Sequence, residues 1–311
     1  MPSDLPATLI SSPAYAISTR RAHEGLTWIV LLCVYGAWLG LTYYATQLPW
    51  WLLMVTGGYV VCLHGSLQHE AVHGHLTGNS AWNAALMVWP LSLWIPFTRY
   101  RTLHQVHHEC PSLTDPVEDP ESFYWTKGEW QSLDALRRGI AMVNQTLAGR
   151  LLLGPVLVMP TYWYREAKLI AAGDRQVGLE WLAHLLAGAA VLGWVSWVCG
   201  LPVWQYLVLF AWPATSLTLL RSYAEHRPGD SNEERTAVVE GSPVTRLLFL
   251  NNNFHLVHHH HPELPWYAIR KLFLARRTEW LERNGGFYFK SYWELARRFA
   301  FRAKDHPVHS R

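Results

Sequence analysis

Near its start, the chain contains two long stretches without any Asp, Glu, Lys or Arg. The first covers residues 26–44 and the second covers residues 48–68. About 20 apolar residues in a helix cross the hydrocarbon core of a bilayer, so each stretch predicts a membrane-spanning helix. The connector at residues 45–49 also lacks Lys and Arg. This composition predicts a tight transmembrane hairpin with its turn outside the cell.

A second hairpin is predicted by the same pattern at residues 182–200 and 204–220, joined by an uncharged connector at 201–203. Lys and Arg are instead concentrated between the two hairpins and after the second one. Because positive residues favour cytoplasmic loops, both termini and the long middle segment are expected in the cytoplasm. Two shorter apolar stretches, 81–97 and 151–164, each contain two prolines. We expect them to be interfacial or re-entrant rather than full spans.

These patterns predict an all-α membrane protein with four transmembrane helices in two hairpins and a cytoplasmic helical cap. We divide the chain into a cytoplasmic N-terminal tail (1–25), an integral membrane domain (26–270) and a cytoplasmic C-terminal segment (271–311). The tail lacks a basic start followed by a long apolar run, so it does not resemble a secretory signal.

The composition supports a membrane protein and excludes some other classes. Charged residues make up 16% of the chain, whereas a soluble domain carries roughly 25%. The net charge of +3 and the absence of a basic aromatic stripe argue against a nucleic-acid partner. The four cysteines form no CxxC pair, so neither a disulfide framework nor a thiolate metal site is indicated.

Histidine is the residue type whose distribution indicates a functional site. Of 17 histidines, 13 fall at residues 64–75, 104–108, 226 and 255–261. The first group contains an HxxxH spacing, and the second and third contain HxxHH spacings, which place the imidazoles on one face of a helix. A catalytic zinc uses three protein ligands, so eight or nine convergent imidazoles indicate two metal ions with four or five ligands each. Imidazole suits Zn, Cu, Fe and Ni alike, and the metal stays open on ligand type alone.

The remaining histidines are expected to have other roles. A polar side chain within a span is costly in lipid, so His64 should face the interior of the helix bundle. The others are expected to be structural (His184), solvated in the tails (His23, His306 and His309), or behind the ligands or at the surface (His260 and His261).

Each metal-binding histidine needs a hydrogen-bond partner at its other ring nitrogen. Carboxylates near the histidine segments are available for this role, and adjacency to predicted ligands favours Glu70 and Glu225. The available set is Glu70, Glu109, Asp115, Asp119, Glu121, Glu225 and Glu240.

The three histidine boxes and the two hairpins, over roughly residues 25–270, resemble the membrane fatty acid desaturase and hydroxylase superfamily. Residues 115–121 look like the corresponding region of membrane alkane hydroxylases and carotenoid ketolases, and residues 251–254 are also similar to this superfamily. The resemblance implies a non-haem di-iron centre that uses O2, with Asn252 or Asn253 contacting iron through water. The ligands that it implies are His69, His73, His104, His107, His108, His226, His255, His258 and His259.

The resemblance also implies removal of hydrogen from the alkyl chain of a fatty acid or fatty acyl lipid. Desaturation is the favoured reaction. A close alternative is oxidative decarboxylation of a free medium-chain fatty acid to a terminal 1-alkene, the reaction of desaturase-like fatty acid decarboxylases. Hydroxylation or ketolation is a third alternative. Arg99 and Arg101, near the second box, are candidates for binding a carboxylate or phosphate head group, although a topological role as positive residues explains them equally well.

Such a reaction needs electrons, and the sequence carries no motif for a flavin, iron–sulfur or haem group. A separate donor such as a ferredoxin or a cytochrome b5 type protein is therefore expected. The short chain fits a bacterial-type enzyme of the inner membrane whose active site faces the cytoplasm.

Two other classes fit parts of the sequence. Residues 69–73 match HExxH, the motif of zinc proteases, but an intramembrane protease leaves the other two boxes unexplained. A histidine-lined metal transporter would place its site near the bilayer midplane, whereas these boxes lie in charged segments.

Overall fold

The computed structural model describes residues 24–309, so most of the predicted N-terminal tail, including His23, lies outside the described residues. The described chain is mostly helical, with one short two-stranded sheet. The first half contains α3 (Gly25–Tyr43), η1 (Ala45–Gln47), α4 (Trp50–Val72), α5 (Ser80–Met87), α6 (Phe97–Glu109), α7 (Lys127–Ser132), α8 (Ala135–Asn144) and α9 (Leu147–Leu152). The second half contains α10 (Gly154–Ala171), α11 (Arg175–Gly193), η2 (Trp194–Val198), α12 (Val203–Tyr206), η3 (Leu207–Ala211), α13 (Trp212–Glu225), β1 (Val238–Val239), α14 (Pro243–Leu248), α15 (His255–His260), α16 (Trp266–Ala275), α17 (Arg277–Arg283), β2 (Tyr288–Phe289) and α18 (Tyr292–Phe299).

Four helices within residues 24–309 are long and apolar enough to cross a membrane: Gly25–Tyr43, Trp50–Val72, Arg175–Val198 and Val203–Glu225. They confirm the four predicted spans, but three of them are longer than the uncharged stretches. Helix α11 begins at Arg175 because the side chain of Asp174 accepts a hydrogen bond from the backbone N–H of Val177. Such a cap satisfies a free helical N–H.

The second hairpin contains two π-helical segments that the apolar pattern does not reveal. Segment η2 continues α11 up to the turn, and η3 lies between α12 and α13 in the returning span. π-helical turns are rare and are often found near functional sites. The returning span then continues to Glu225, directly before His226.

The proline-interrupted stretches are not among the four candidate spans. Residues 81–97 contain most of α5 and then a largely non-helical connection to α6. Pro160, however, lies inside α10, which continues for 18 residues. A proline removes one helical hydrogen bond, and the long helix around it accommodates this loss.

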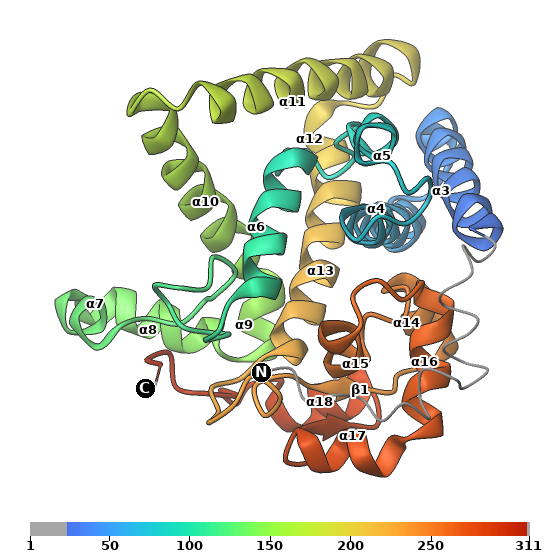
Figure 1. Ribbon diagram of the computed structural model, residues 1–311. Helices are drawn as coiled ribbons and strands as arrows, with labels where there is room; N and C mark the ends of the chain where they lie inside the picture. The colour runs from blue at the N-terminus through green and yellow to red at the C-terminus, as the bar shows by residue number, and fades with distance from the viewer. Residues whose placement is uncertain (1–23, 310–311) are drawn as a thin grey trace.

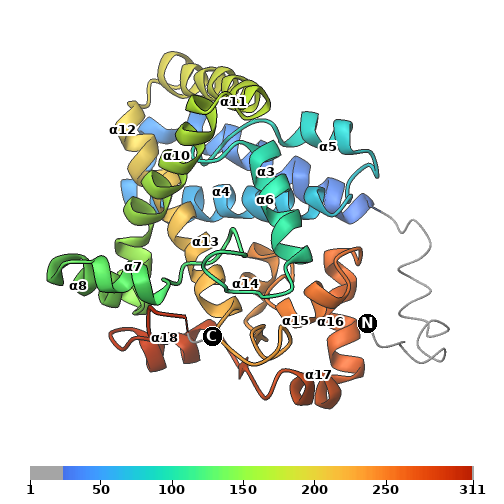
Figure 2. The same ribbon diagram turned by 60° about the vertical axis from the view of Figure 1, so that its left-hand side comes forward.

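Helix α4 packs in the middle of the apolar core, against α3, η3 and α13. Figures 1 and 2 show α3 and α4 side by side, with α11 at the opposite end of the molecule from α15, α16 and α17. Gly57 and Gly58 allow the close approach of α4 to the returning span. A Cβ atom at Gly57 would lie 2.6 Å from the Phe210 ring, and one at Gly58 would lie 2.7 Å from Pro213.

The predicted C-terminal segment packs tightly against the rest of the chain. β2 pairs in parallel with β1, joining Tyr288 to Val238 and Phe289 to Val239. Further along, the backbone N–H of Trp125 donates to the carbonyl of Pro307 at 2.9 Å. The segment therefore contacts the loop that follows the second histidine box.

Candidate metal centre

Four elements bring the histidine segments together. Helix α4 carries His69 in its last turn and is followed directly by His73, and α6 carries the second box. His226 directly follows α13, and α15 begins at His255. His108 and His258, which are 150 residues apart, approach to 3.1 Å through their Nε2 atoms.

The nine histidines form two groups that could each hold a metal ion. Within a group, one candidate ligand atom of each residue lies within 4.8 Å of those of all the others. The first group has five members and the second has four, which agrees with the ligand count expected for two metals. The first is His69, His73, His104, His108 and His258, and the second is His107, His226, His255 and His259.

Each HxxHH box is divided between the two groups. In α6, His104 and His108 belong to the first group and His107 to the second. In α15 the division is reversed, because its i and i+4 residues belong to the second group and His258 belongs to the first. A helix places i and i+4 nearly above each other and turns i+3 to the side. Both helices therefore contribute to both groups.

The outer ring nitrogens of four histidines have hydrogen-bond acceptors. The Nδ1 atom of His104 lies 2.8 Å from Glu121 Oε1, and that of His107 lies 2.8 Å from Asp119 Oδ1. In the second group, His226 Nδ1 lies 3.2 Å from the carbonyl of Arg235, and His255 Nδ1 lies 3.1 Å from Asn252 Oδ1. Each Nδ1 must carry the proton in order to donate, which leaves the Nε2 lone pair free in the neutral ring.

The inner nitrogens face one another at distances that suit a cation between them. His255 Nε2 lies 3.0 Å from His226 Nε2, although both atoms carry lone pairs when the rings are neutral. Nitrogen ligands bind a metal such as zinc at about 2.0–2.1 Å, and two such ligands at a right angle lie about 3.0 Å apart. The donor set therefore fits a metal ion. A cation between the two nitrogens would bind both lone pairs, which otherwise repel each other.

Burial keeps these rings neutral. Burial, together with the neighbouring His107, lowers the pKa of His226 to about 3. Burial and the nearby His259 and His226 hold the pKa of His255 well below its usual range. Each neutral ring has a single N–H, which the acceptor beside Nδ1 holds on that nitrogen. Neither Nε2 atom therefore has a proton to turn the short contact into an ordinary hydrogen bond at neutral pH.

Asn252 lies between the two groups. Its Nδ2 is 3.3 Å from His69 Nε2 in the first group, and its Oδ1 is 3.1 Å from His255 Nδ1 in the second. The side chain is 1% exposed. Asn253 instead donates to the backbone carbonyl of Val239 at 2.5 Å.

The two favoured carboxylates differ in their contacts. Glu225 Oε1 lies 3.3 Å from His255 Nδ1 and 3.1 Å from Arg221 Nε. Glu70 Oε1 lies 3.8 Å from His69 Nδ1, while its Oε2 accepts a hydrogen bond from the backbone N–H of Trp266. Glu225 is therefore in position to orient a ring, whereas Glu70 mainly joins α4 to the start of α16.

The structure gives Arg99 a partner that the sequence analysis did not consider. Arg99 Nε and Nη2 donate to the two oxygens of Glu166 at 2.7 and 3.0 Å. Its charge is therefore paired within the protein, and its role in binding a head group stays a prediction. Arg101 Nη1 donates to Ser80 Oγ at 2.7 Å, and its role in binding a head group stays a prediction.

The other histidines lie outside the two groups. His64 is buried, as expected, and lies 3.2 Å from the Tyr35 hydroxyl. His260 contacts Glu233 at 2.9 Å and His261 lies 3.6 Å from Glu263. The expectation for His309 was wrong, because it is 4% exposed and its Nε2 lies 2.9 Å from Thr114 Oγ1. The tail is folded back onto the protein at this point.

Two features of the site were missed by the sequence analysis. Arg221, one turn before Glu225, is a half-buried cation that pairs with this carboxylate, and a lone Arg near the end of an apolar span was the available signal. Lys304 donates to the backbone carbonyls of Tyr223 and His226, each at 2.5 Å. No local pattern around Lys304 indicated this contact.

Comparison with known families agrees with the geometry. A model of the family described as fatty acid desaturase matches residues 45–292, a range that includes all nine histidines. No curated protein matches the chain.

Proposed function

This chain belongs to the fatty acid desaturase family, and from this premise we propose that it desaturates the alkyl chain of a fatty acid or fatty acyl lipid with O2. The family makes it an oxidoreductase, and its four long apolar helices make it an integral membrane protein. We propose further that the nine grouped histidines hold two iron ions. Bound iron would supply the activation of O2 and the removal of hydrogen from an unactivated C–H bond.

The observation that carries this proposal is the pair of histidine groups, with five and four members. A single catalytic zinc needs three protein ligands, so a one-metal enzyme leaves most of these imidazoles unexplained. The HExxH alternative also needs a carboxylate poised as a base. Glu70 instead accepts a hydrogen bond from the backbone of Trp266, which favours the two-metal proposal.

The residues around the groups would hold the ligands rigidly and exclude water. Asp119 and Glu121 accept from the outer nitrogens of His107 and His104, which fixes the orientation of each ring. The rings themselves are mostly buried, with His104, His107 and His258 each 1% exposed. A dry site protects reactive oxygen chemistry from side reactions.

The reaction balance requires a partner. Removal of two hydrogen atoms from the chain and reduction of O2 to two water molecules consume two further electrons and two protons. The sequence holds no motif for a redox group that could supply these electrons. We propose a separate donor, of the ferredoxin or cytochrome b5 type, acting at a site that faces the cytoplasm of a bacterial-type inner membrane.

Product analysis tests the reaction. Membranes that contain the protein would be incubated with fatty acids, a reductant system and O2, and the products separated by gas chromatography with mass spectrometry. Desaturation yields an internal alkene that keeps its carboxyl group. A terminal alkene with release of CO2 would replace the proposal by decarboxylation, and an oxygenated chain would replace it by hydroxylation or ketolation.

Metal analysis of the purified protein tests the centre independently of the product. Two iron ions per chain are expected. One zinc ion per chain would contradict the di-iron proposal and favour the protease alternative.

A further inference from the structure

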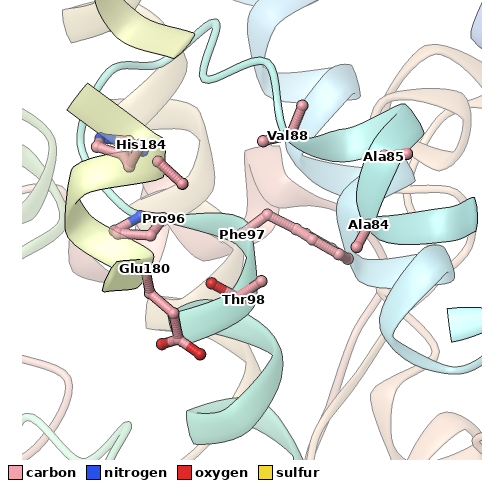
Figure 3. Close-up of a pocket in the computed structure, with 9 residues that line it drawn as sticks. Ala84, Ala85, Val88, Pro96, Phe97, Thr98, Glu180 and His184 are labelled. Atoms are coloured by element: carbon pink, nitrogen blue, oxygen red, sulfur yellow. The ribbon is translucent and has the colours of Figure 1, made fainter. Parts of the chain in front are cut away.

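Helix α6, which carries the second histidine box, is held in different ways at its two ends. Its first turn packs between two other helices, and Figure 3 shows Phe97 of α6 between Ala84 of α5 and Glu180 of α11. Its last turn carries His107, a member of the second group, and leads into a loop in which Asp119 contacts the outer nitrogen of this ring. The orientation of His107 therefore depends on what holds the loop in place.

Thr114, in this loop, has a backbone conformation that is unusual for its residue type. Its φ angle of 69° lies in the left-handed region, where a β-branched residue is a genuine outlier. The residue is buried. Strain of this kind persists only where the surrounding structure enforces it, and it is concentrated at functional sites. The contacts of Thr114 therefore identify what enforces the strained turn.

Three contacts hold Thr114 in this conformation. Its backbone N–H donates to Asp119 Oδ2 at 2.8 Å, and its carbonyl accepts from Ser122 Oγ at 2.7 Å. Its hydroxyl lies 2.9 Å from Nε2 of His309, near the C-terminus. The first two partners are close in the sequence, whereas His309 is 195 residues away. The side chain of Thr114 is thus held by a distant part of the chain.

Asp119 joins Thr114 to a predicted metal ligand. One of its carboxylate oxygens, Oδ2, accepts from Thr114, and the other, Oδ1, lies 2.8 Å from His107 Nδ1. The Asp119 side chain is buried, so these partners and not solvent determine how the carboxylate is turned. A shift of Thr114 would rotate the carboxylate and, with it, the His107 ring.

The tail that carries His309 is itself anchored by main-chain hydrogen bonds. After α18 it passes the end of α8, where the backbone N–H of Lys304 donates to the carbonyl of Gln145 at 2.9 Å (Figure 1). Trp125 then donates its backbone N–H to the carbonyl of Pro307, and its own carbonyl accepts from the N–H of His309, at 2.9 and 3.0 Å. These bonds place the His309 ring against Thr114.

We propose that His309 is a positioning residue for the second histidine group. By contacting the hydroxyl of Thr114 it maintains the left-handed turn, and the backbone N–H of Thr114 then orients Asp119 and the His107 ring behind it. This inference rests on the proposed two-metal function, because the orientation of His107 affects metal retention only if this ring is a ligand. His309 lies beyond the family match, which ends at residue 292, so the support is additional to the matched segment.

Two variants break the contact from opposite sides. His309→Ala removes the imidazole, whereas Thr114→Val removes the hydroxyl but keeps the branched shape and the backbone N–H. In each variant the chelator concentration that removes half of the bound metal should fall about fivefold, the factor that corresponds to one hydrogen bond of about 1 kcal/mol. Bound metal of any kind is quantified by mass spectrometry of the elements. Thr114→Ser keeps the hydroxyl and should behave as the wild type, as should His306→Ala at an exposed position of the tail.

The double variant distinguishes positioning through this contact from a general loss of stability. If one contact is responsible, His309→Ala with Thr114→Val should retain metal as well as either single variant. Independent effects would instead multiply to about 25-fold. A multiplied effect, or unchanged retention in His309→Ala, overturns the proposal.

Hydrogen exchange of the same preparations tests the contact itself. Peptides that cover residues 111–121 should exchange faster in His309→Ala than in His306→Ala, because the Thr114 turn loses its distant partner. Equal exchange overturns the proposal. A wild-type protein without two bound metal ions would contradict the proposed function, whereas a two-metal wild type with an unaffected His309→Ala variant would contradict this inference alone.

Discussion

At the scale of single residues, the hydrogen-bond partner of Nδ1 determines whether Nε2 of the same histidine has a lone pair for a metal ion. His104, His107, His226 and His255 each have an acceptor at Nδ1. Their Nε2 lone pairs are consequently directed inward, and a cation is the natural counterpart. Neighbouring residues of similar type that lie outside the two histidine groups and their hydrogen bonds serve as controls for the substitutions predicted below.

The first prediction compares two histidines of the third box. His258→Ala removes one member of the five-residue group and should reduce both bound iron and activity to background. His260→Ala removes an exposed ring that contacts Glu233 and should retain both. Iron per chain and product yield are measured on the same preparations. Full iron content in His258→Ala would remove this residue from the metal centre.

The second prediction concerns the acceptor behind a ligand. Asp119→Ala removes the partner of His107 Nδ1, and a lost outer partner lowers metal affinity about 10- to 100-fold. Glu118→Ala, at the exposed neighbouring position, should have no effect. Iron retained during titration with a chelator reports the difference. Equal retention by the two variants would show that Asp119 does not support the site.

The histidines were predictable from their spacing, but their arrangement was not. HxxxH and HxxHH spacings identify eight of the nine grouped residues, because i, i+3 and i+4 share a helix face. His226 stands alone in the sequence and was expected only from the family resemblance. The division of each box between two groups depends on how α6 and α15 cross, and the sequence holds no local signal for this. The contact of Asn252 with both groups and the pairing of Arg99 with Glu166 are also long-range outcomes.

At the scale of elements, the C-terminal end of α13 is held by a distant lysine. The side chain of Lys304 is 3% exposed and donates to the carbonyls of Tyr223 and His226. A cation is favourable at the end of a helix where carbonyls lack partners. Residue 304 lies beyond the family match, which ends at residue 292.

The third prediction tests this contact. Lys304→Met keeps much of the apolar stem but leaves two carbonyls without their donor, which should destabilise the protein by about 1–3 kcal/mol and weaken iron binding through His226. Lys290→Met, at an exposed position, is the control. Thermal unfolding in detergent and iron content are the measurements. A Lys304 variant as stable and as iron-rich as the control would contradict this role.

The apolar pattern predicted the four spans because each is a long run without charge. It placed their ends poorly, since the caps and the histidine-bearing turns are polar. Helix α11 begins at Arg175, directly after the Asp174 cap and seven residues before the apolar run, and α4 extends through His69 to Val72. The π-helical segments η2 and η3 leave no signature in composition.

At the scale of the whole molecule, the geometry of the two histidine groups depends on how closely the spans pack. Gly58 on α4 faces Pro213, and an added Cβ atom would lie 2.7 Å away. Small residues let membrane helices approach each other. α4 and α13 both lead directly into the histidine groups, so their separation sets the geometry of the site.

The fourth prediction follows from this packing. Gly58→Ala should push α4 away from the returning span and lower both the thermal stability and the iron content. Gly65→Ala is the matched control on the same helix, because an added Cβ atom there meets nothing within 4 Å. Replacement by alanine favours helix formation by up to about 1 kcal/mol in both cases, so the difference between the variants isolates the close contact. Equal melting temperatures would show that α4 can shift without loss.

The division of each HxxHH box between two groups has a consequence for how the enzyme matures. Because α6 and α15 contribute to both groups, binding of the first ion would immobilise the two helices that also carry rings of the second group. The second ion then meets a lower entropic cost, which is positive cooperativity without any change of shape. Chains isolated from iron-limited cells should therefore be either empty or fully loaded, and half-loaded chains should be scarce.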